Sequence, residues 1–179
     1  MEGEVLDIHR RQRILFSREE IADRVRGLGQ EISKDYGNKE LVVISLLRGS
    51  FIFTADLVRE ITIPVEVDFM TTSSYGHSEE SSGIVEIVHD IRTDIKDRDV
   101  LIVDDIMDSG YTLEKVVEYL RGKSPRSLKI CVLLDKPSRR KVDLSPDYIG
   151  FNIPDVFIVG YGLNYGDHYR NIPYIFTFD

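Results

Sequence analysis

The sequence predicts an α/β fold in which helices flank a mostly parallel central sheet. Short apolar runs alternate with longer segments of helical periodicity, and residues 41–47 and 100–103 are typical of strands buried on both faces. Strand–helix–strand alternation favours parallel pairing with right-handed crossovers. The 179 residues, 42% hydrophobic and 30% charged, contain no linker, internal repeat or low-complexity tract. We therefore expect a single domain over residues 1–179, large enough for a sizeable core.

The first half of the chain predicts two helices and two strands. Ser17 and Glu20 form a capping box, and apolar residues at positions 21, 25, 28 and 32 recur at helical spacing, so we expect a helix over residues 18–36. Gly37 suits the end of this helix. A strand at 41–47, a helix ending near residue 60 and a strand at 63–70 follow.

Residues 71–83 form a long polar segment with five serines, two glycines and two glutamates. A loop of this length inside a compact domain is uncommon and is often a functional lid, although a disordered hairpin tip is the alternative. Further strands are expected at 84–88, 100–103, 128–134, 156–159 and 174–178. A helix with apolar positions 113, 116, 117 and 120 follows the strand at 100–103.

Composition excludes several classes of protein. The net charge of −8 argues against non-specific nucleic-acid binding, which needs a positive surface. No apolar run approaches the roughly 20 residues that span a bilayer, and the acidic N-terminus does not resemble a signal peptide. We expect a cytoplasmic protein without membrane or nucleic-acid partners. Cys131, the only cysteine, lies in an expected core strand and cannot form an intrachain disulfide.

Residues 100–112 carry the most chemical information. The carboxylates of Asp104 and Asp105 come at the end of a buried strand, Asp108 follows, and Ser109 and Gly110 lead into a helix. Ligands of open α/β sheets bind just beyond the carboxyl ends of the strands, and small residues at a helix N-terminus form a phosphate cradle. Acceptor carboxylates beside a phosphate site suit a phosphorylated sugar.

This segment carries a family resemblance. Residues 103–112, Val-Asp-Asp-Ile-Met-Asp-Ser-Gly-Tyr-Thr, resemble the phosphoribosyl pyrophosphate signature of type I phosphoribosyltransferases. Three further segments, residues 46–50, 133–140 and 150–163, resemble the hypoxanthine-guanine branch of that family. The resemblance implies the type I phosphoribosyltransferase fold. It also implies a small hood built from the N-terminal segment and residues 136–179, and a flexible flap at about 71–83.

The resemblance implies roles for the phosphoribosyl site. Asp104 and Asp105 would accept hydrogen bonds from the ribose hydroxyls and organise Mg²⁺, while Asp108 would be the general base near N7 of the purine. The 5′-phosphate would be bound by the loop Ser109, Gly110, Tyr111 and Thr112. From the residues alone, Asp108 could equally be a helix cap, and the paired aspartates could end a strand in solvent.

The resemblance also implies pyrophosphate and purine contacts. Pyrophosphate would be bound by Arg48, Gly49, Arg170, Ser74 and Tyr75. The purine would be bound by Lys136 at its 6-oxo group, by stacking of Phe157, and by the backbone of Ile158. Without the resemblance, Lys136 would be a solvated residue, Phe157 a core aromatic and Arg170 a surface residue. We expect residues 139–141 to be a solvated basic run, and family members often have a cis peptide at Leu47–Arg48.

Asn164 departs from the pattern, because most relatives have an aspartate there as a Mg²⁺ ligand. A neutral amide oxygen is a poorer ligand for Mg²⁺, and Asp167 could compensate.

The implied function is purine salvage. The enzyme would use Mg²⁺ to join hypoxanthine or guanine to phosphoribosyl pyrophosphate, releasing pyrophosphate and giving IMP or GMP, and it would form a homodimer or homotetramer. One alternative is a transferase of the same fold for xanthine or another base, and a second is a nucleotide-sensing RNA-binding regulator. A nucleotide kinase or hydrolase is disfavoured because the chain has neither a Walker A motif nor a nucleophile elbow.

Overall fold

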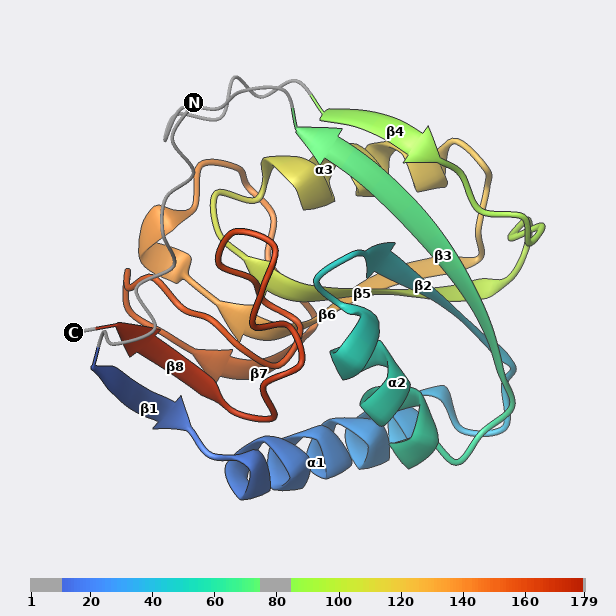
Figure 1. Cartoon of the computed structure of the whole chain (residues 1–179). Coiled ribbons are helices and arrows are strands. Elements are labelled where there is room, and N and C mark those ends of the chain that lie inside the picture. The colour runs from blue at the N-terminus through green and yellow to red at the C-terminus, as the bar shows by residue number, and fades with distance from the viewer. Residues whose placement is uncertain (1–10, 75–84, 179) are drawn as a thin grey trace.

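The computed structural model describes residues 11–74 and 85–178 (Figure 1). Within these residues the main sheet has six strands in the order β4-β3-β2-β5-β6-β7. Every neighbouring pair is parallel except β3 and β4, so the predicted mostly parallel α/β sheet is confirmed. The strands are β2 (Leu41–Leu47), β3 (Val65–Ser74), β4 (Val85–His89), β5 (Asp99–Met107), β6 (Ser127–Asp135) and β7 (Tyr148–Asn152).

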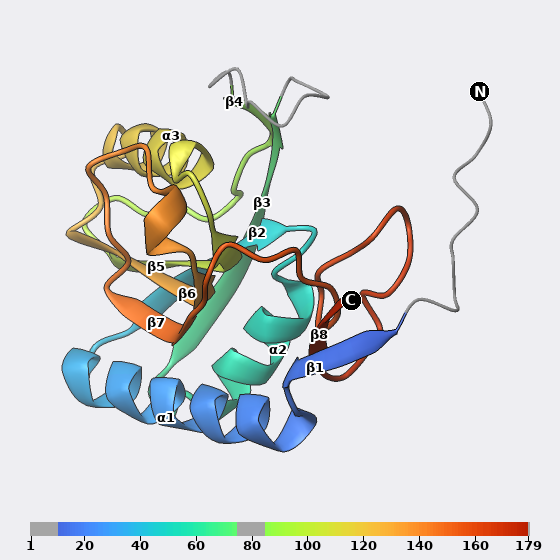
Figure 2. The ribbon, with the colours of Figure 1, turned by 90° about the vertical axis from the view of Figure 1, so that its left-hand side faces the viewer.

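Helices cover both faces of the sheet. The helices α1 (Arg18–Tyr36) and α2 (Phe51–Glu60) lie on one face, and α3 (Tyr111–Arg121) lies on the other (Figure 2). Alternate residues of β2 and β5 supply the two cores: Leu41 and Leu101 pack with α1 and α2, while Val42 and Val100 pack with α3. Burial on both faces explains why these strands are continuous apolar runs.

The ends of α1 follow the sequence signals. The Ser17 side chain accepts from the Glu20 backbone N–H at 3.2 Å, and the Glu20 carboxylate accepts from the Ser17 N–H at 2.8 Å, which completes the predicted capping box. Gly37 ends the helix at φ 59°, and its N–H donates to the Ser33 carbonyl. In the middle of the helix, Arg24 Nε donates to the Gly150 carbonyl at 2.8 Å and so attaches α1 to β7.

A second, two-stranded sheet joins segments from opposite ends of the described chain. It pairs β1 (Gln12–Phe16) with β8 (Ile175–Phe178) in antiparallel register. The sequence analysis predicted β8 but not β1. This small sheet lies beside α1 and α2, apart from the main sheet (Figure 2).

The structure corrects three expectations. Residues 156–159 are not a strand; the sixth strand of the main sheet is β7, which the sequence analysis missed. The Val156 N–H donates to the Pro154 carbonyl at 2.9 Å and Gly160 adopts φ 100°, so the chain turns locally at both ends of this run, and only Val159 forms a bridge, with Phe176. Strand β3 continues to Ser74, so residues 71–74 belong to the sheet rather than to the expected loop. The remainder of that expected flap, including Tyr75, lies outside the described residues.

One further feature agrees with the sequence analysis. Cys131 is fully buried in β6, and desolvation raises the pKa of its thiol, as expected for a core residue. Across the two described ranges, none of the helices is both long and apolar enough to cross a membrane.

Candidate active site

A short loop joins β5 to α3 and leaves a small cavity at the helix N-terminus. Gly110 adopts φ 92°, and a Cβ at this position would lie 2.5 Å from Val142 Cγ2, so the turn requires glycine. Helix α3 begins at Tyr111, and the first N–H groups of a helix have no intrahelical acceptor. These donors suit an anion. The cavity, of about 130 Å³, is lined by Asp104, Ile106, Met107, Asp108, Ser109, Gly110, Thr112 and Leu113.

The second half of β5 holds two half-buried carboxylates side by side. The Asp105 backbone N–H donates to Asp104 Oδ1 at 3.0 Å. Desolvation raises the pKa of Asp104 well above its usual range, and the neighbouring charge of Asp105 raises it further. Desolvation likewise raises the pKa of Asp105, although the positive charge of Arg170 opposes the shift. Such a pair is stabilised by a cation or by hydroxyl donors.

The loop after β2 packs directly against this carboxylate pair. The Leu47–Arg48 peptide is cis. A Cβ on Gly49 would lie 1.9 Å from Asp105 Oδ2, and a Cβ on Gly162 would lie 2.2 Å from the Gly49 carbonyl oxygen. Arg170 Nη1 donates to the Gly162 carbonyl at 2.6 Å. Three segments that are distant in the sequence therefore meet at Asp105.

A buried hydroxyl network supports the loop after β2. Ser45 Oγ lies 2.8 Å from both Ser50 Oγ and Thr54 Oγ1, and Ser50 Oγ donates to the Leu46 carbonyl at 2.5 Å. The sequence analysis missed Ser45 and Thr54; a hydroxyl inside the otherwise apolar strand β2 was the available signal. Arg48 is exposed and pairs with no acidic residue in the described part of the chain, so its guanidinium is free to bind an anion.

The expected solvated basic run is contradicted only at Arg140, which is partly buried, whereas Arg139 and Lys141 are exposed as expected. Arg139 Nε donates to Asp108 Oδ1 at 2.8 Å, and Arg139 Nη1 donates to Asp155 Oδ2 at 3.3 Å. Arg140 is partly buried, forms an ion pair with Asp135, and donates to the Asp108 carbonyl at 3.3 Å. Arg139 contacts carboxylates that follow β5 and β7, which the local sequence does not reveal, whereas Arg140 pairs with Asp135 at the end of β6, five residues before it.

The predicted purine-binding residues lie near this edge of the sheet. Lys136 is 7% exposed, and its Nζ lies 3.6 Å from Asp155 Oδ1, so it is not the solvated lysine of the alternative interpretation. Phe157 is 57% exposed and is not a core aromatic; its ring packs edge-on against Tyr165, with centroids 5.7 Å apart. Ile158 is buried. An exposed aromatic ring can stack on a flat polar ligand, and a lysine ammonium can donate a hydrogen bond to one.

One predicted site residue, Asn164, is not joined to this cluster. Asn164 is exposed, and its side-chain amide donates to the Gly166 carbonyl rather than to either aspartate. Ser74 ends β3, but its side chain is not described, and Tyr75 lies outside the described residues.

The paired aspartates fit Mg²⁺. The described ranges contain no cluster of three or more His, Cys, Asp or Glu side chains that could hold a metal ion without further ligands. Protein-bound Mg²⁺ commonly uses one or two carboxylates and takes its remaining ligands from water and substrate phosphates. Asp104 and Asp105 supply that donor set, and a bound cation would offset the desolvation that raises the pKa of each carboxyl.

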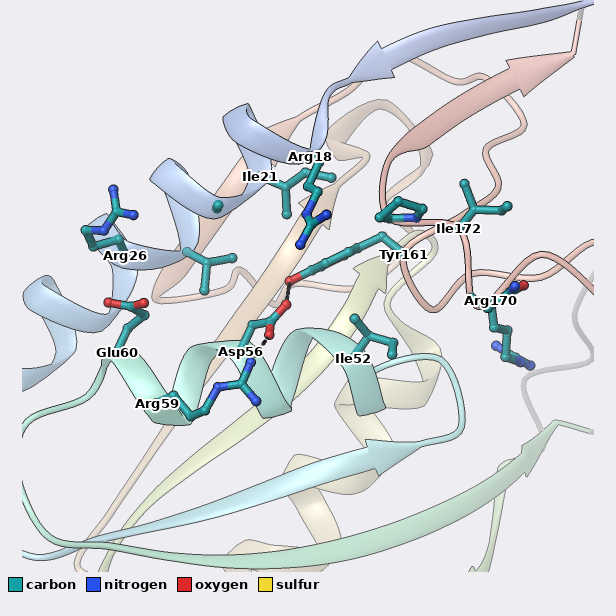
Figure 3. A pocket seen from close by; sticks show the side chains of 14 residues that line it. Arg18, Ile21, Arg26, Ile52, Asp56, Arg59, Glu60, Tyr161, Arg170 and Ile172 are labelled. Carbon is teal, nitrogen blue, oxygen red and sulfur yellow. Dashed lines mark hydrogen bonds and ion pairs between the residues drawn. The ribbon is translucent and has the colours of Figure 1, made fainter.

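A larger cavity, of about 440 Å³, lies between α1, α2 and the turn near Tyr161 (Figure 3). There the Tyr161 hydroxyl donates to Asp56 Oδ2 at 2.6 Å, and Asp56 also pairs with Arg59. Burial, followed by this hydrogen bond, raises the pKa of Tyr161. Arg170 lines this cavity too, but the lining contains neither paired acceptor carboxylates nor a glycine-rich helix start. The features that suit a phosphorylated sugar therefore lie in the smaller cavity at β5 and α3.

Comparison with known proteins identifies the family to which this chain is similar. The phosphoribosyl transferase domain family matches residues 12–166. The hypoxanthine phosphoribosyltransferase of Buchnera aphidicola is 52% identical over 165 residues, which cover 91% of this chain and 93% of that protein. The hypoxanthine-guanine phosphoribosyltransferase of Bacillus subtilis is 47% identical over 93% of each chain. A crystal structure of the Bacillus anthracis hypoxanthine-guanine phosphoribosyltransferase, 45% identical, superimposes with a TM-score of 0.90 over 93% of this chain and 98% of that one.

Proposed function

This chain belongs to the phosphoribosyl transferase domain family, and on that premise we propose that it transfers the 5-phosphoribosyl group of phosphoribosyl pyrophosphate to N9 of hypoxanthine or guanine. The products are IMP or GMP and pyrophosphate, and the reaction salvages purine bases. This proposal rests on one observation: the Gly49 loop and the start of α3 both lie beside the β5 carboxylates. An anion-binding turn therefore lies next to acceptors for sugar hydroxyls.

The phosphoribosyl group would lie along the end of β5. Its 5′-phosphate accepts hydrogen bonds from the loop of Ser109 and Gly110 and from the first N–H groups of α3, at Tyr111 and Thr112. Its 2′- and 3′-hydroxyls donate to Asp104 and Asp105, whose desolvation makes new donors favourable.

Pyrophosphate would leave on the opposite side of the ribose. Arg48, Gly49 and Arg170 supply positive charge and backbone donors for it, and Ser74 and Tyr75 belong to the same proposal as flap residues. Mg²⁺ held by Asp104 and Asp105 would neutralise charge on the departing pyrophosphate. Asn164 is the weakest member of the proposed ligand set because its oxygen is neutral.

Purine attack at C1′ forms the N9–C1′ bond as the C1′–oxygen bond to pyrophosphate breaks. Asp108 accepts the proton that the purine must lose, a contribution of about 10²–10⁴-fold in rate. The remaining rate acceleration comes from positioning and from stabilisation of the cation-like ribose. Lys136 donates to the 6-oxo group, Phe157 stacks on the ring and the Ile158 backbone contacts its edge. Because an ammonium only donates, an amino group at the 6-position would be rejected.

The same proposal includes a homodimer or homotetramer. The α2-side face of β3 exposes Val67 and Phe69, and Phe51 at the start of α2 is exposed as well. Exposed large apolar side chains can take part in a protein interface. We place the enzyme in the cytoplasm, because its multiply charged substrate does not cross a bilayer unaided.

A substrate panel tests the proposed activity. Purified protein with Mg²⁺ and phosphoribosyl pyrophosphate is offered hypoxanthine, guanine, xanthine, adenine and uracil in turn, and nucleotide formation is followed by absorbance. We expect turnover with hypoxanthine, guanine or both, and none with adenine. Turnover only with xanthine would change the substrate, and absence of turnover with every 6-oxopurine would refute the proposal.

A further inference from the structure

Four charged side chains form a continuous row across the carboxyl ends of β5, β6 and β7. We call Asp108, Arg139, Asp155 and Lys136 the charge row. Arg139 Nε lies 2.8 Å from Asp108 Oδ1, Arg139 Nη1 lies 3.3 Å from Asp155 Oδ2, and Lys136 Nζ lies 3.6 Å from Asp155 Oδ1. The charges alternate in sign along the row, and its two ends are the proposed general base and the proposed 6-oxo ligand.

The residues of the charge row come from different strand ends. Asp108 follows β5, Lys136 follows β6, Arg139 ends the short 3₁₀ helix Pro137–Arg139, and Asp155 follows β7. The backbone braces the row as well, because the Lys136 N–H donates to the Met107 carbonyl at 3.0 Å and the Ile153 N–H donates to the Asp135 carbonyl at 2.9 Å. The position of each polar group is therefore coupled to the others.

The geometry leaves the reactive atoms free. Arg139 occupies only Oδ1 of Asp108, and a carboxylate has a second oxygen that can accept the purine proton. Hydrogen bonds to Asp108 and Asp155 raise the pKa of Arg139, so its guanidinium stays charged. A planar guanidinium can bind two carboxylates in fixed directions, which a lysine ammonium cannot do. In the described residues, Asp155 is also the one carboxylate within ion-pair distance of the buried Lys136.

We propose that Arg139, acting with Asp155, is a positioning residue that sets the orientation of the Asp108 carboxylate and its placement relative to Lys136, and so aligns the purine for attack. This inference rests on the proposed function. It goes beyond that function because it assigns a role to Arg139 and Asp155, neither of which contacts the phosphates or the ribose in the proposed mechanism. An oriented base is more effective because the proton must be taken at one atom of the purine.

Steady-state kinetics of Arg139→Gln and Arg139→Lys test the role. We expect Arg139→Gln to lower kcat/KM for hypoxanthine by about 10- to 100-fold, since a misplacement near 1 Å costs up to this much. The KM for phosphoribosyl pyrophosphate should stay within about twofold of wild type, because its binding groups are untouched. Arg139→Lys should recover only part of the loss. The matched control is Arg26→Gln, which removes an exposed arginine from an ion pair of 2.7 Å with Asp23 and should leave activity unchanged.

A double-mutant cycle separates positioning from mere structural support. If Arg139 acts through Asp108, Arg139→Gln should change kcat by less than about twofold in an Asp108→Asn background. The inference would be overturned if Arg139→Gln lowered kcat equally in the wild-type and Asp108→Asn backgrounds. It would also be overturned if thermal melting showed that both Arg139 variants are inactive because they do not fold. Full activity of Arg139→Gln with an active wild type would refute only this role. An inactive wild type would refute the proposed function and this inference together.

Discussion

Gly49→Ala is the substitution for which the structure gives the clearest magnitude. The new Cβ would lie 1.9 Å from Asp105 Oδ2 and 2.6 Å from Asp105 Cγ, whereas real Cβ atoms essentially never come closer than 3.0 Å to such a neighbour. The carboxylate oxygen and the loop must therefore separate by at least 1.1 Å, the difference between 3.0 Å and 1.9 Å. Neither partner can move freely, because Asp105 is held within β5 and the loop is anchored through Ser50.

A displacement of this size should reduce catalysis more than stability. Misplacement by about 1 Å near reacting groups costs up to 10²-fold, which corresponds to about 2.7 kcal/mol at 1.36 kcal/mol per factor of ten. Overpacking should lower the free energy of unfolding by about 1–3 kcal/mol, so the variant should remain folded at 25 °C. The assay is kcat/KM for phosphoribosyl pyrophosphate at saturating hypoxanthine, together with a thermal melt.

Two other glycines provide matched controls. Gly27 lies in α1, where the nearest atom to a new Cβ is 3.5 Å away, so Gly27→Ala should raise stability by about 0.5–1 kcal/mol and leave kinetics unchanged. Gly29 packs against Glu60, with a new Cβ only 2.5 Å from its Cβ, so Gly29→Ala should lower stability without a specific loss of kcat/KM. If folded Gly49→Ala retained kcat/KM within about threefold of wild type, the contact of this loop with Asp105 would not belong to the catalytic site.

Three further predictions follow from the carboxylates and the purine-binding residues. Because folding raises the pKa of Asp104, stability of the metal-free protein should fall as pH rises above about 4, and Asp104→Asn should reduce that loss. Thermal melting in EDTA at pH 7 should therefore show Asp104→Asn to be more stable than wild type by about 1–2 kcal/mol, although the variant should be less active. An equal dependence of stability on pH in the two proteins would contradict this. Asn164→Asp should lower the Mg²⁺ concentration needed for half-maximal rate, whereas an unchanged titration would exclude a ligand role. Lys136→Gln should raise the KM for hypoxanthine and weaken discrimination against adenine; unchanged selectivity would rule out contact with the 6-oxo group.

The parts of the fold predictable from the sequence are those with local or periodic signals. The buried strands β2, β5 and β6 are continuous apolar runs, and the capping box fixes the start of α1. β7 was missed because it is short and contains Gly150. The strand needs glycine at this position, since a Cβ would lie 2.3 Å from the Leu133 carbonyl oxygen. Residues 156–159 have the apolar composition of a buried strand, but the Phe157 ring is exposed and packs against Tyr165 rather than in the core.

The site residues likewise divide into those with a local sequence signal and those without one. The aspartates and the phosphate loop lie within ten consecutive residues, so a single motif identified them. Arg139 could not be identified in this way, because its partners Asp108 and Asp155 are 31 and 16 residues away and only the sheet brings them together. The close approach of Gly162 to the Gly49 carbonyl was not predictable either, because the loop after β2 and the turn at Gly162 are far apart in the sequence.

A crystal structure with bound IMP and Mg²⁺ tests the central claim most directly, because the two cavities predict different positions for the nucleotide. The account predicts that the 5′-phosphate accepts hydrogen bonds from the N–H groups at the start of α3, with the ribose hydroxyls facing Asp104 and Asp105. A phosphate bound instead among the arginines of the larger cavity between α1 and α2 would contradict it.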